Sequence, residues 1–312
     1  MMRVIDFHCD TPKLLYERNA SLRFESAMAG GDATDAFRPY VQLAACFAPT
    51  KETDDVAFLS VCGMLEHLNR CIKAAPDAML VSDVSSLRYA TRRSCAAYIP
   101  TVEDARILAG DISRVDTLFS LGVRLITPLW RGETVMGGAW NEETGLSAFA
   151  TDALSRFLSL GGIVDTSHAS RKAHADILLL CRHYGRAPLA THSNAYSLTP
   201  HLRNLTDEQI REIGLLGGVV GVNLYPNFLT TSNPASMQNI ALHLRHIMNV
   251  GGCECAVLGS DFDGVDTLPL GISCASDLEK LATYLKKANF SSREIDRFFF
   301  KNAQKYLFEN LP

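Results

Sequence analysis

The sequence predicts an α/β fold, a (β/α)8 barrel of the TIM type, from three observations. Short apolar runs alternate with amphipathic segments, which is typical of a parallel sheet with helical crossovers. The chain has 312 residues, of which 47% are hydrophobic and 21% charged, enough for one such barrel with a large core. Polar residues stand just past the ends of several apolar runs, where barrel proteins gather the side chains of a single pocket. We therefore predict one catalytic domain over residues 1–312.

The predicted strands are the apolar runs themselves, and there are as many of them as a barrel of this type requires. We expect strands at 4–7, 40–46, 95–102, 123–127, 163–166, 189–191, 219–223 and 256–260. Parallel strands joined by helices place all their carboxyl ends at the same end of the barrel.

The predicted helices are amphipathic stretches with apolar residues at helical spacing. We expect them at 54–75, 113–121, 150–160, 171–184, 206–215, 235–250, 276–288 and 291–308. Thr206 with Gln209, and Ser291 with Glu294, have the spacing of a capping box and predict two of the helix starts.

Two long segments depart from the regular alternation. Residues 19–37 form a polar insertion after the first strand, for which a lid and a surface loop are equally open interpretations. Residues 132–146 follow the carboxyl end of a strand, and loops at that end of a barrel usually shape the pocket.

Composition limits the partners and the compartment. A net charge of -4 without Lys or Arg clusters gives no footprint for nucleic acid or an anionic membrane, so we expect a small-molecule ligand. No apolar stretch is long enough to span a bilayer, and we expect no cleaved signal region. The nine scattered cysteines do not suggest a disulfide framework, which favours a cytoplasmic protein. A homodimer is expected because barrel enzymes of this size are commonly symmetric dimers.

Metal-binding residue types end several of the predicted strands. His8 and Asp10 are two apart on an extended segment, so both can face the same side. His168 and His192 end two other runs, and Glu103 ends a third with a carboxylate that can bridge two ions. Imidazole and carboxylate without thiolate favour zinc, although manganese, iron and cobalt are chemically possible. Two metals ~3.5–4 Å apart would hold a hydroxide and polarise a carbonyl or phosphoryl oxygen, which predicts hydrolysis.

Two acidic residues follow the last predicted strand in Gly259-Ser-Asp261-Phe-Asp263-Gly264. Acidic side chains beside a strand end are costly to bury unless they have a task. We assign a functional role to Asp261 and a supporting or structural role to Asp263.

Five segments together resemble the membrane dipeptidase (renal dipeptidase) family of zinc peptidases. They occur in that family's order, with roughly its spacing, and cover nearly the whole chain: Asp6-Phe-His8-Cys-Asp10, residues 162–170, Pro188-Leu-Ala-Thr-His192-Ser-Asn, Leu202-Arg203-Asn204-Leu-Thr-Asp207 and residues 258–264. The resemblance implies that His8 and Asp10 bind one Zn2+, that His168 and His192 bind the other, and that Glu103 bridges the two.

The same resemblance implies roles around the metals. Water held between the ions would attack the peptide carbonyl of a free dipeptide, L-L or L-D, and Asp261 would handle the proton of this water and of the leaving amine. Arg203 would pair with the C-terminal carboxylate of the substrate, unless it is a surface arginine. Tyr225 matches a pocket tyrosine, and a packed aromatic is the alternative.

The chain departs from animal members of the family at Trp130. Their strand ends Thr-Leu-Thr-His, whereas this sequence reads Leu125-Ile-Thr-Pro-Leu-Trp130. Tryptophan cannot accept a proton, although its indole N–H can donate one hydrogen bond. In the animal members this histidine contacts the substrate near the scissile bond. We do not expect Trp130 to polarise the substrate carbonyl in its place, and the indole could instead form a wall of the pocket. The chain looks like a soluble, microbial-type relative.

Two other functions remain open. The same ligands could serve an amidohydrolase-like enzyme that acts on a lactone, a cyclic amide or a phosphotriester. Arg203 discriminates between this enzyme and a dipeptidase, because a buried guanidinium is needed only if the substrate carries an anionic group. A non-catalytic, metal-stabilised binding protein is the second alternative, but it would have no need of an acid-base carboxylate such as Asp261.

Overall fold

All the predicted strands form in the computed structural model, which describes residues 1–93, 95–232 and 234–312. They lie in one parallel sheet in the order β8-β5-β4-β2-β1-β11-β10-β9. Their bounds are β1 Met2–Cys9, β2 Phe37–Phe47, β4 Ala96–Glu103, β5 Leu125–Thr127, β8 Ile163–Val164, β9 Leu189–Ala190, β10 Val219–Val222 and β11 Ala256–Leu258. The prediction of a mainly parallel α/β sheet is confirmed.

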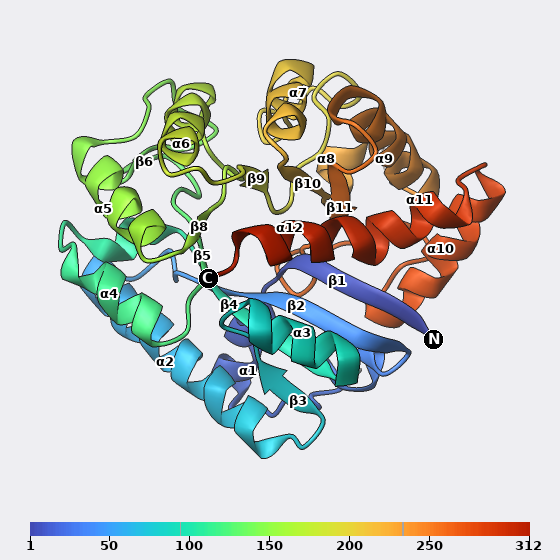
Figure 1. Ribbon diagram of the computed structural model, residues 1–312, viewed down its shortest axis with the longest axis horizontal. Coiled ribbons are helices and arrows are strands. Elements are labelled where there is room, and N and C mark those ends of the chain that lie inside the picture. The colour runs from blue at the N-terminus through green and yellow to red at the C-terminus, as the bar shows by residue number, and fades with distance from the viewer. Residues whose placement is uncertain (94, 233) are drawn as a thin grey trace.

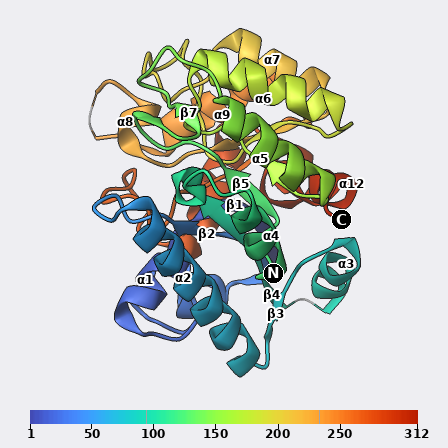
Figure 2. The same ribbon diagram turned by 90° about the vertical axis from the view of Figure 1, so that its left-hand side faces the viewer.

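The two ends of this sheet meet. A parallel bridge joins Asp165, directly after β8, to Leu189 in β9, and the amide of Thr166 donates to the Leu189 carbonyl at 2.9 Å. The sheet is thus nearly closed into the predicted barrel, with the helices around the outside of the strands (Figures 1 and 2). β9, β10 and β11 converge so tightly that a Cβ on Gly221 or Gly259 would lie 1.8 or 1.9 Å from the Thr191 carbonyl oxygen.

The predicted long helices are present within a few residues of their expected bounds. They are α2 Asp54–Ala74, α4 Ser113–Ser120, α5 Ala148–Ser159, α6 Arg171–His183, α7 Asp207–Leu215, α9 Met237–Gly251 and α10 Leu278–Lys287. Both predicted capping boxes form, at Thr206 and Ser291. The last predicted helix differs, because a wide π-helical turn at Arg297–Lys301 separates α11 Ser292–Asp296 from α12 Asn302–Asn310.

Several shorter elements add to the predicted set. They are α1 Thr11–Arg18, β3 Ala78–Leu80, α3 Val84–Arg93, α8 Pro226–Leu229, the hairpin β6 Glu133–Thr134 with β7 Gly137–Gly138, and the 3-10 turns η1 Gly31–Thr34, η2 Ala105–Leu108 and η3 Ala275–Asp277. β3 extends the sheet by pairing with the first residues of β4. The hairpin lies inside the predicted 132–146 loop.

The C-terminal helix closes one end of the barrel. α12 crosses the middle of the molecule in Figure 1, and its Tyr306 packs edge-on against Phe7 of β1 with ring centroids 5.9 Å apart. Tyr306 and Leu307 share a buried cluster with the first residues of several strands, including Leu125 and Val219. α12 therefore lies at the amino ends of the strands, and the carboxyl ends are left free to form a pocket.

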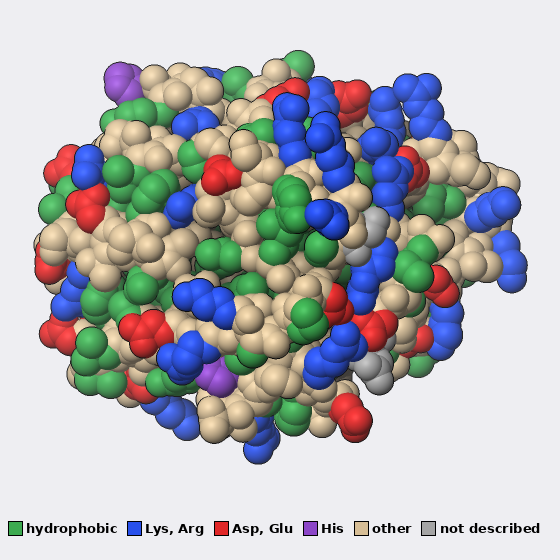
Figure 3. Space-filling model, turned by 60° about the horizontal axis from the view of Figure 1, so that its bottom comes forward, with side chains coloured by type: hydrophobic (Ala, Val, Ile, Leu, Met, Phe, Trp, Pro, Cys, Tyr) green, Lys and Arg blue, Asp and Glu red, His purple; other side chains and the backbone are tan. Residues whose placement is uncertain are grey.

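None of the helices in the described part of the chain is both long and apolar enough to cross a membrane. On the face shown in Figure 3, hydrophobic side chains lie in small groups among charged ones. The assignment of residues 1–312 to one domain and the homodimer both stay predictions.

Candidate metal centre

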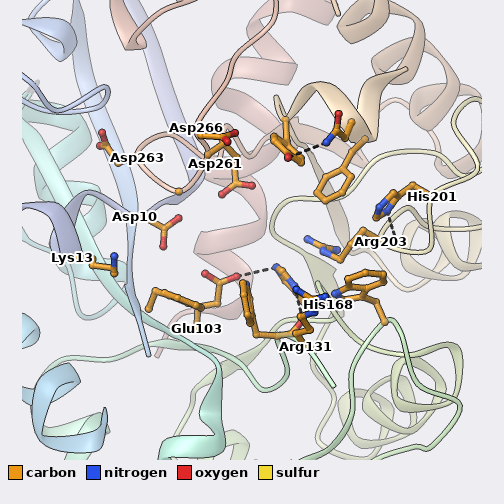
Figure 4. Close-up of a pocket in the computed structure, with 18 residues that line it drawn as sticks. Asp10, Lys13, Glu103, Arg131, His168, His201, Arg203, Asp261, Asp263 and Asp266 are labelled. Carbon is orange, nitrogen blue, oxygen red and sulfur yellow. Dashed lines mark hydrogen bonds and ion pairs between the residues drawn. The ribbon is translucent and has the colours of Figure 1, made fainter. Parts of the chain in front are cut away.

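The predicted ligands come from separate strands and meet at one end of the barrel, where Asp10, Glu103 and His168 line a pocket. His8 lies in β1 and Asp10 directly follows it, Glu103 is the last residue of β4, His168 follows β8 and His192 follows β9. All five have side chains at most 10% exposed. The pocket at this end of the barrel holds about 560 Å³, and Figure 4 shows Asp10, Glu103 and His168 directed into it.

Glu103 lies between two groups of ligand atoms. Its Oε2 is 3.4 Å from His8 Nε2, which in turn is 3.4 Å from Asp10 Oδ2. Its Oε1 is 2.9 Å from His168 Nε2 and 3.6 Å from His192 Nε2. One carboxylate thus offers one oxygen to each group, which is the arrangement that bridging of two ions requires.

In two of the three ligand histidines, the hydrogen bond at Nδ1 determines which ring nitrogen carries the proton. His168 Nδ1 lies 3.0 Å from the Trp130 carbonyl oxygen and must donate to it. The Thr191 hydroxyl donates to Asp165 at 2.6 Å, so it accepts from His192 Nδ1 at 2.7 Å. Both rings therefore carry their proton on Nδ1 and present a lone pair on Nε2.

These lone pairs face one another, which is unfavourable without a cation. The Nε2 atoms of His168 and His192 are 2.9 Å apart, and Glu103 Oε1 adds a third electron-rich atom. The buried Nε2 of His8 has no hydrogen-bond partner among the described residues. Imidazole nitrogens and carboxylate oxygens suit zinc and related divalent metals, so this set of residues fits metal ions.

The electrostatics differ between the two sides of Glu103. Burial lowers the pKa of His168 and, with His8 and Arg203 nearby, holds the pKa of His192 well below its ordinary value, which favours the neutral rings that bind metals. Burial opposes a charged His8, but Glu103 and Asp10 outweigh it and raise its pKa.

Burial also sets the carboxylates apart. It raises the pKa of Asp10 to about 7, although His8 acts in the opposite direction. For Glu103, burial is outweighed by His8 and His168, so its pKa lies well below the ordinary range. Glu103 is therefore the carboxylate that stays ionised, as a bridging ligand must.

Asp261 lies at the edge of the ligand cluster. One of its oxygens is within 4.8 Å of ligand nitrogens of His8 and His192, and Asn223 donates to its Oδ2 at 2.9 Å. Asp261 and His168 both have a φ of +65°, a left-handed conformation that is uncommon for residues other than glycine. Such conformations persist where surrounding contacts hold them, often at functional sites.

Arg203 is a pocket residue and not a surface arginine. It is only 4% exposed, it donates from Nη2 to the His192 carbonyl at 3.2 Å, and its buried Nε has no partner among the described residues. Burial lowers the pKa of Arg203 to about 10, against the opposing effect of Asp261 and other carboxylates, so the guanidinium stays charged at neutral pH. The pocket therefore holds one buried cation beside the ligand cluster.

Tyr225 and Trp130 both line the pocket. Tyr225 precedes α8 and packs on Phe228 at 5.0 Å, and its hydroxyl accepts from Asn227 at 2.9 Å. The ring of Trp130 packs on Phe47 at 5.0 Å. Trp130 thus walls the pocket with its side chain and orients His168 with its backbone.

Several lining residues were not among the predicted site residues. Trp140 and His201 form a ring pair 5.5 Å apart, and Lys13, Arg131 and Phe228 also line the pocket. Trp140 lies in the 132–146 loop, which was expected to shape the pocket, and a tryptophan in such a loop was the available signal. The other four each lie within three residues of a predicted site residue, namely Asp10, Trp130, Arg203 or Tyr225, and this proximity along the chain was their only signal.

Two relatives are similar in sequence to more than half of this chain. It is 33% identical over 219 residues to an uncharacterized protein in the pqqA 5' region of Klebsiella pneumoniae. This alignment covers 66% of this chain and 79% of that protein. It is 34% identical over 188 residues to an uncharacterized dipeptidase of Schizosaccharomyces pombe, with 57% of this chain and 44% of that protein covered.

Solved structures share the fold. A metallopeptidase from Rhodobacter sphaeroides, liganded with a phosphinate mimic of the dipeptide L-Ala-D-Ala, superimposes with a TM-score of 0.91 at 23% identity, covering 100% of this chain and 99% of that one. The probable dipeptidase PvdM from Pseudomonas aeruginosa gives 0.88 at 16% identity, covering 99% and 95%.

A family profile decides the assignment. The profile described as "Membrane dipeptidase (Peptidase family M19)" matches residues 1–310, which is almost the whole chain. The chain therefore belongs to the membrane dipeptidase family, peptidase family M19, and is a metal-dependent hydrolase.

Proposed function

We propose that this enzyme hydrolyses the peptide bond of free dipeptides, L-L and L-D, at a site that holds two zinc ions. His8 and Asp10 would hold one ion, His168 and His192 the other, and Glu103 both. The observation that carries this proposal is the two-sided placement of Glu103, with each carboxylate oxygen 2.9 to 3.4 Å from a different histidine. Bound zinc would supply a nucleophilic hydroxide at neutral pH and polarise the scissile carbonyl.

The protein's own residues would select and orient the substrate. Arg203 would receive the C-terminal carboxylate, since a charged and buried guanidinium is suited to two-pronged binding of a carboxylate. Asp261, held by Asn223, would accept a proton from the attacking water and return it to the leaving amine. The aromatic side chains around Arg203, including Tyr225, would exclude water from the bound dipeptide.

Two observations support a peptidase over another hydrolase. A lactone or phosphotriester has no carboxylate to pair with Arg203, so binding such a substrate would leave the cost of burying this cation without a compensating ion pair. The Rhodobacter sphaeroides relative was solved with a mimic of L-Ala-D-Ala, which supports dipeptides with a second D-residue as substrates here.

The test combines metal content with cleavage. Elemental analysis of the purified enzyme, paired with a panel of L-L and L-D dipeptides, should give about two zinc equivalents and chelator-sensitive cleavage. C-terminally amidated dipeptides serve as the matched substrates that lack the carboxylate and should be cleaved poorly. Two metals without cleavage of any dipeptide would refute the substrate assignment, and one metal would refute the binuclear site.

We also propose a cytoplasmic homodimer. All nine cysteines are unpaired, which suits a reducing compartment. Light scattering of the purified enzyme would test the dimer.

A further inference from the structure

The loop after β11 carries a second aspartate, Asp263, whose carboxylate accepts no hydrogen bond from the predicted metal ligands among the described residues. Figure 4 shows Asp261 directed toward Glu103 and His168, whereas Asp263 points away from them. Asp263 accepts three hydrogen bonds from other parts of the chain. Its Oδ1 accepts from the Met28 amide at 2.6 Å, and its Oδ2 accepts from the Ala29 amide at 3.3 Å and from the Thr11 hydroxyl at 2.6 Å.

These partners belong to two different parts of the chain. Met28 and Ala29 lie in the insertion, defined here as residues 19–36 between α1 and β2, and Thr11 begins α1 directly after Asp10. The buried Gln42 side chain of β2 donates to Thr11 Oγ1 at 3.1 Å and to the Ala29 carbonyl at 3.2 Å. One carboxylate thus joins the loop after β11, the start of α1 and the insertion.

The insertion does not reach the substrate itself. No residue described between 19 and 36 lines the pocket, and Ala29 is buried. The Met28 carbonyl also accepts from the Ala275 amide at 2.8 Å. A segment held at both Met28 and Ala29 by Asp263, a lining residue of the pocket, is a fixed support, which argues against the interpretation of residues 19–37 as a lid.

The loop that Asp263 holds has little freedom. Asp261 and Asp263 both have a φ of +65°, and such residues need surrounding contacts to keep them there. The next residue, Gly264, passes so close to the ligand cluster that a Cβ on it would lie 2.1 Å from Asp10 Oδ2 and 2.6 Å from Asp261 Oδ1. A small shift of this loop would therefore move the Asp261 carboxylate relative to the metal ligands.

We propose that Asp263 is a positioning residue, which clamps the loop after β11 onto the insertion and onto Thr11 and thereby fixes the orientation of Asp261. This inference rests on the proposed function, because Asp261 is the residue to which we assign proton transfer. The clamp itself is independent of that assignment.

The test compares Asp263→Ala with Asp35→Asn. Asp35 lies in the same insertion, where it pairs with Arg23 and Arg38 at 2.7 Å, so its removal weakens the insertion without touching the clamp. Asp263→Ala should lower kcat by about tenfold or more, since small misplacements of catalytic groups carry such losses. KM and zinc content should stay within about twofold of wild type, and Asp35→Asn should keep wild-type kcat.

Two readouts do not depend on activity. Hydrogen exchange in the peptide that contains Met28 and Ala29 should be faster in Asp263→Ala, whereas exchange in α6, which has no hydrogen bond to Asp263 among the described residues, should be unchanged. A crystal structure of Asp263→Ala should show Asp261 displaced from Asn223. Asp263→Asn keeps one acceptor oxygen for the Met28 amide and should restore part of the lost kcat.

Three outcomes would overturn the proposal. They are wild-type kcat in Asp263→Ala, loss of zinc together with activity, which would assign the effect to Asp10, and an Asp261 that keeps its contact with Asn223 in the crystal. A wild-type enzyme that cleaves no dipeptide would refute the proposed function instead, while exchange and crystallography would still decide whether Asp263 positions Asp261.

Discussion

Thr191 links the buried Asp165 carboxylate to His192. Its hydroxyl donates to Asp165 Oδ2 at 2.6 Å and lies 2.7 Å from His192 Nδ1. Asp165 also accepts from the Thr191 amide at 2.9 Å, across the seam where β8 and β9 meet, and from the Thr127 hydroxyl of β5 at 2.7 Å. The carboxylate that helps to close the barrel therefore also sets the tautomer of a predicted metal ligand.

Thr191→Val should weaken metal binding. Valine has the same shape but no hydroxyl, so His192 Nδ1 loses the acceptor that orients the ring. Loss of such a partner typically lowers metal affinity by ~10–100-fold. Competition with a chromophoric chelator measures this change.

Thr127→Val is the matched control for Thr191→Val. It removes another hydroxyl from the same Asp165 oxygen, and Thr127 has no hydrogen bond to His192 among the described residues. Both variants should lose about 1–3 kcal/mol of unfolding free energy because a buried acceptor loses a donor. Equal metal affinity in the two variants would show that Thr191 does not act through His192.

Arg203→Ala should raise KM for dipeptides much more than it lowers kcat. The guanidinium is charged and buried beside the predicted metal ligand His192, so its loss removes ground-state binding of the substrate carboxylate. A charge-assisted hydrogen bond contributes roughly 1.5–3 kcal/mol, which corresponds to a rise in KM of about 10–100-fold. Steady-state kinetics on one dipeptide and its C-terminal amide measure the effect.

The amide supplies the contrast within that experiment. Wild type should discriminate strongly against the amide, and Arg203→Ala should lose most of that discrimination. Cleavage of the amide by wild type at the rate of the free dipeptide would refute the carboxylate contact.

Metal affinity should fall as the pH falls below about 7. In the metal-free protein, burial raises the pKa of Asp10 to about 7, so this carboxyl holds a proton below that pH and metal binding must displace it. Each displaced proton weakens apparent binding about tenfold per pH unit below the pKa. Chelator competition between pH 8 and pH 5.5 should show affinity falling more steeply below about pH 7 than above it, because His8, whose pKa is also raised, must release a proton at the higher pH values too.

A buried carboxyl outside the ligand set provides the control. Burial raises the pKa of Asp104 to about 6, and this residue pairs with Arg106 at 3.1 Å. Asp104→Asn should therefore keep the wild-type dependence of metal affinity on pH. A pH-independent affinity in wild type would mean that Asp10 is not a ligand.

Much of this site could be predicted because strand ends were visible in the sequence. His8, Glu103, His168 and His192 each follow or end an apolar run, and parallel strands bring such residues together whatever the loops do. The function of Asp165 was not predictable, because its donors come from three separate positions in the chain.

Other elements were missed for lack of a local pattern. In α3 only Leu87 and Ala90 are buried, too few for a continuous apolar face. The predicted helix at 291–308 has continuous apolar periodicity, and nothing in that pattern marks the π-helical turn at Arg297–Lys301. The path of Trp140 depends on a tertiary contact, a 2.7 Å hydrogen bond from its amide to the His168 carbonyl.

Trp130→Ala should change substrate selectivity without loss of metal. The indole lines the pocket and packs on Phe47, so alanine enlarges the space for substrate side chains. His168, in contrast, bonds to the backbone carbonyl of residue 130 at 3.0 Å, and any amino acid supplies that acceptor. We therefore expect wild-type zinc content together with a relative gain in kcat/KM for dipeptides with bulky side chains. Elemental analysis and competition between a small and a large dipeptide measure the two effects. Loss of zinc in Trp130→Ala would mean that the indole, and not only the backbone, holds His168 in place.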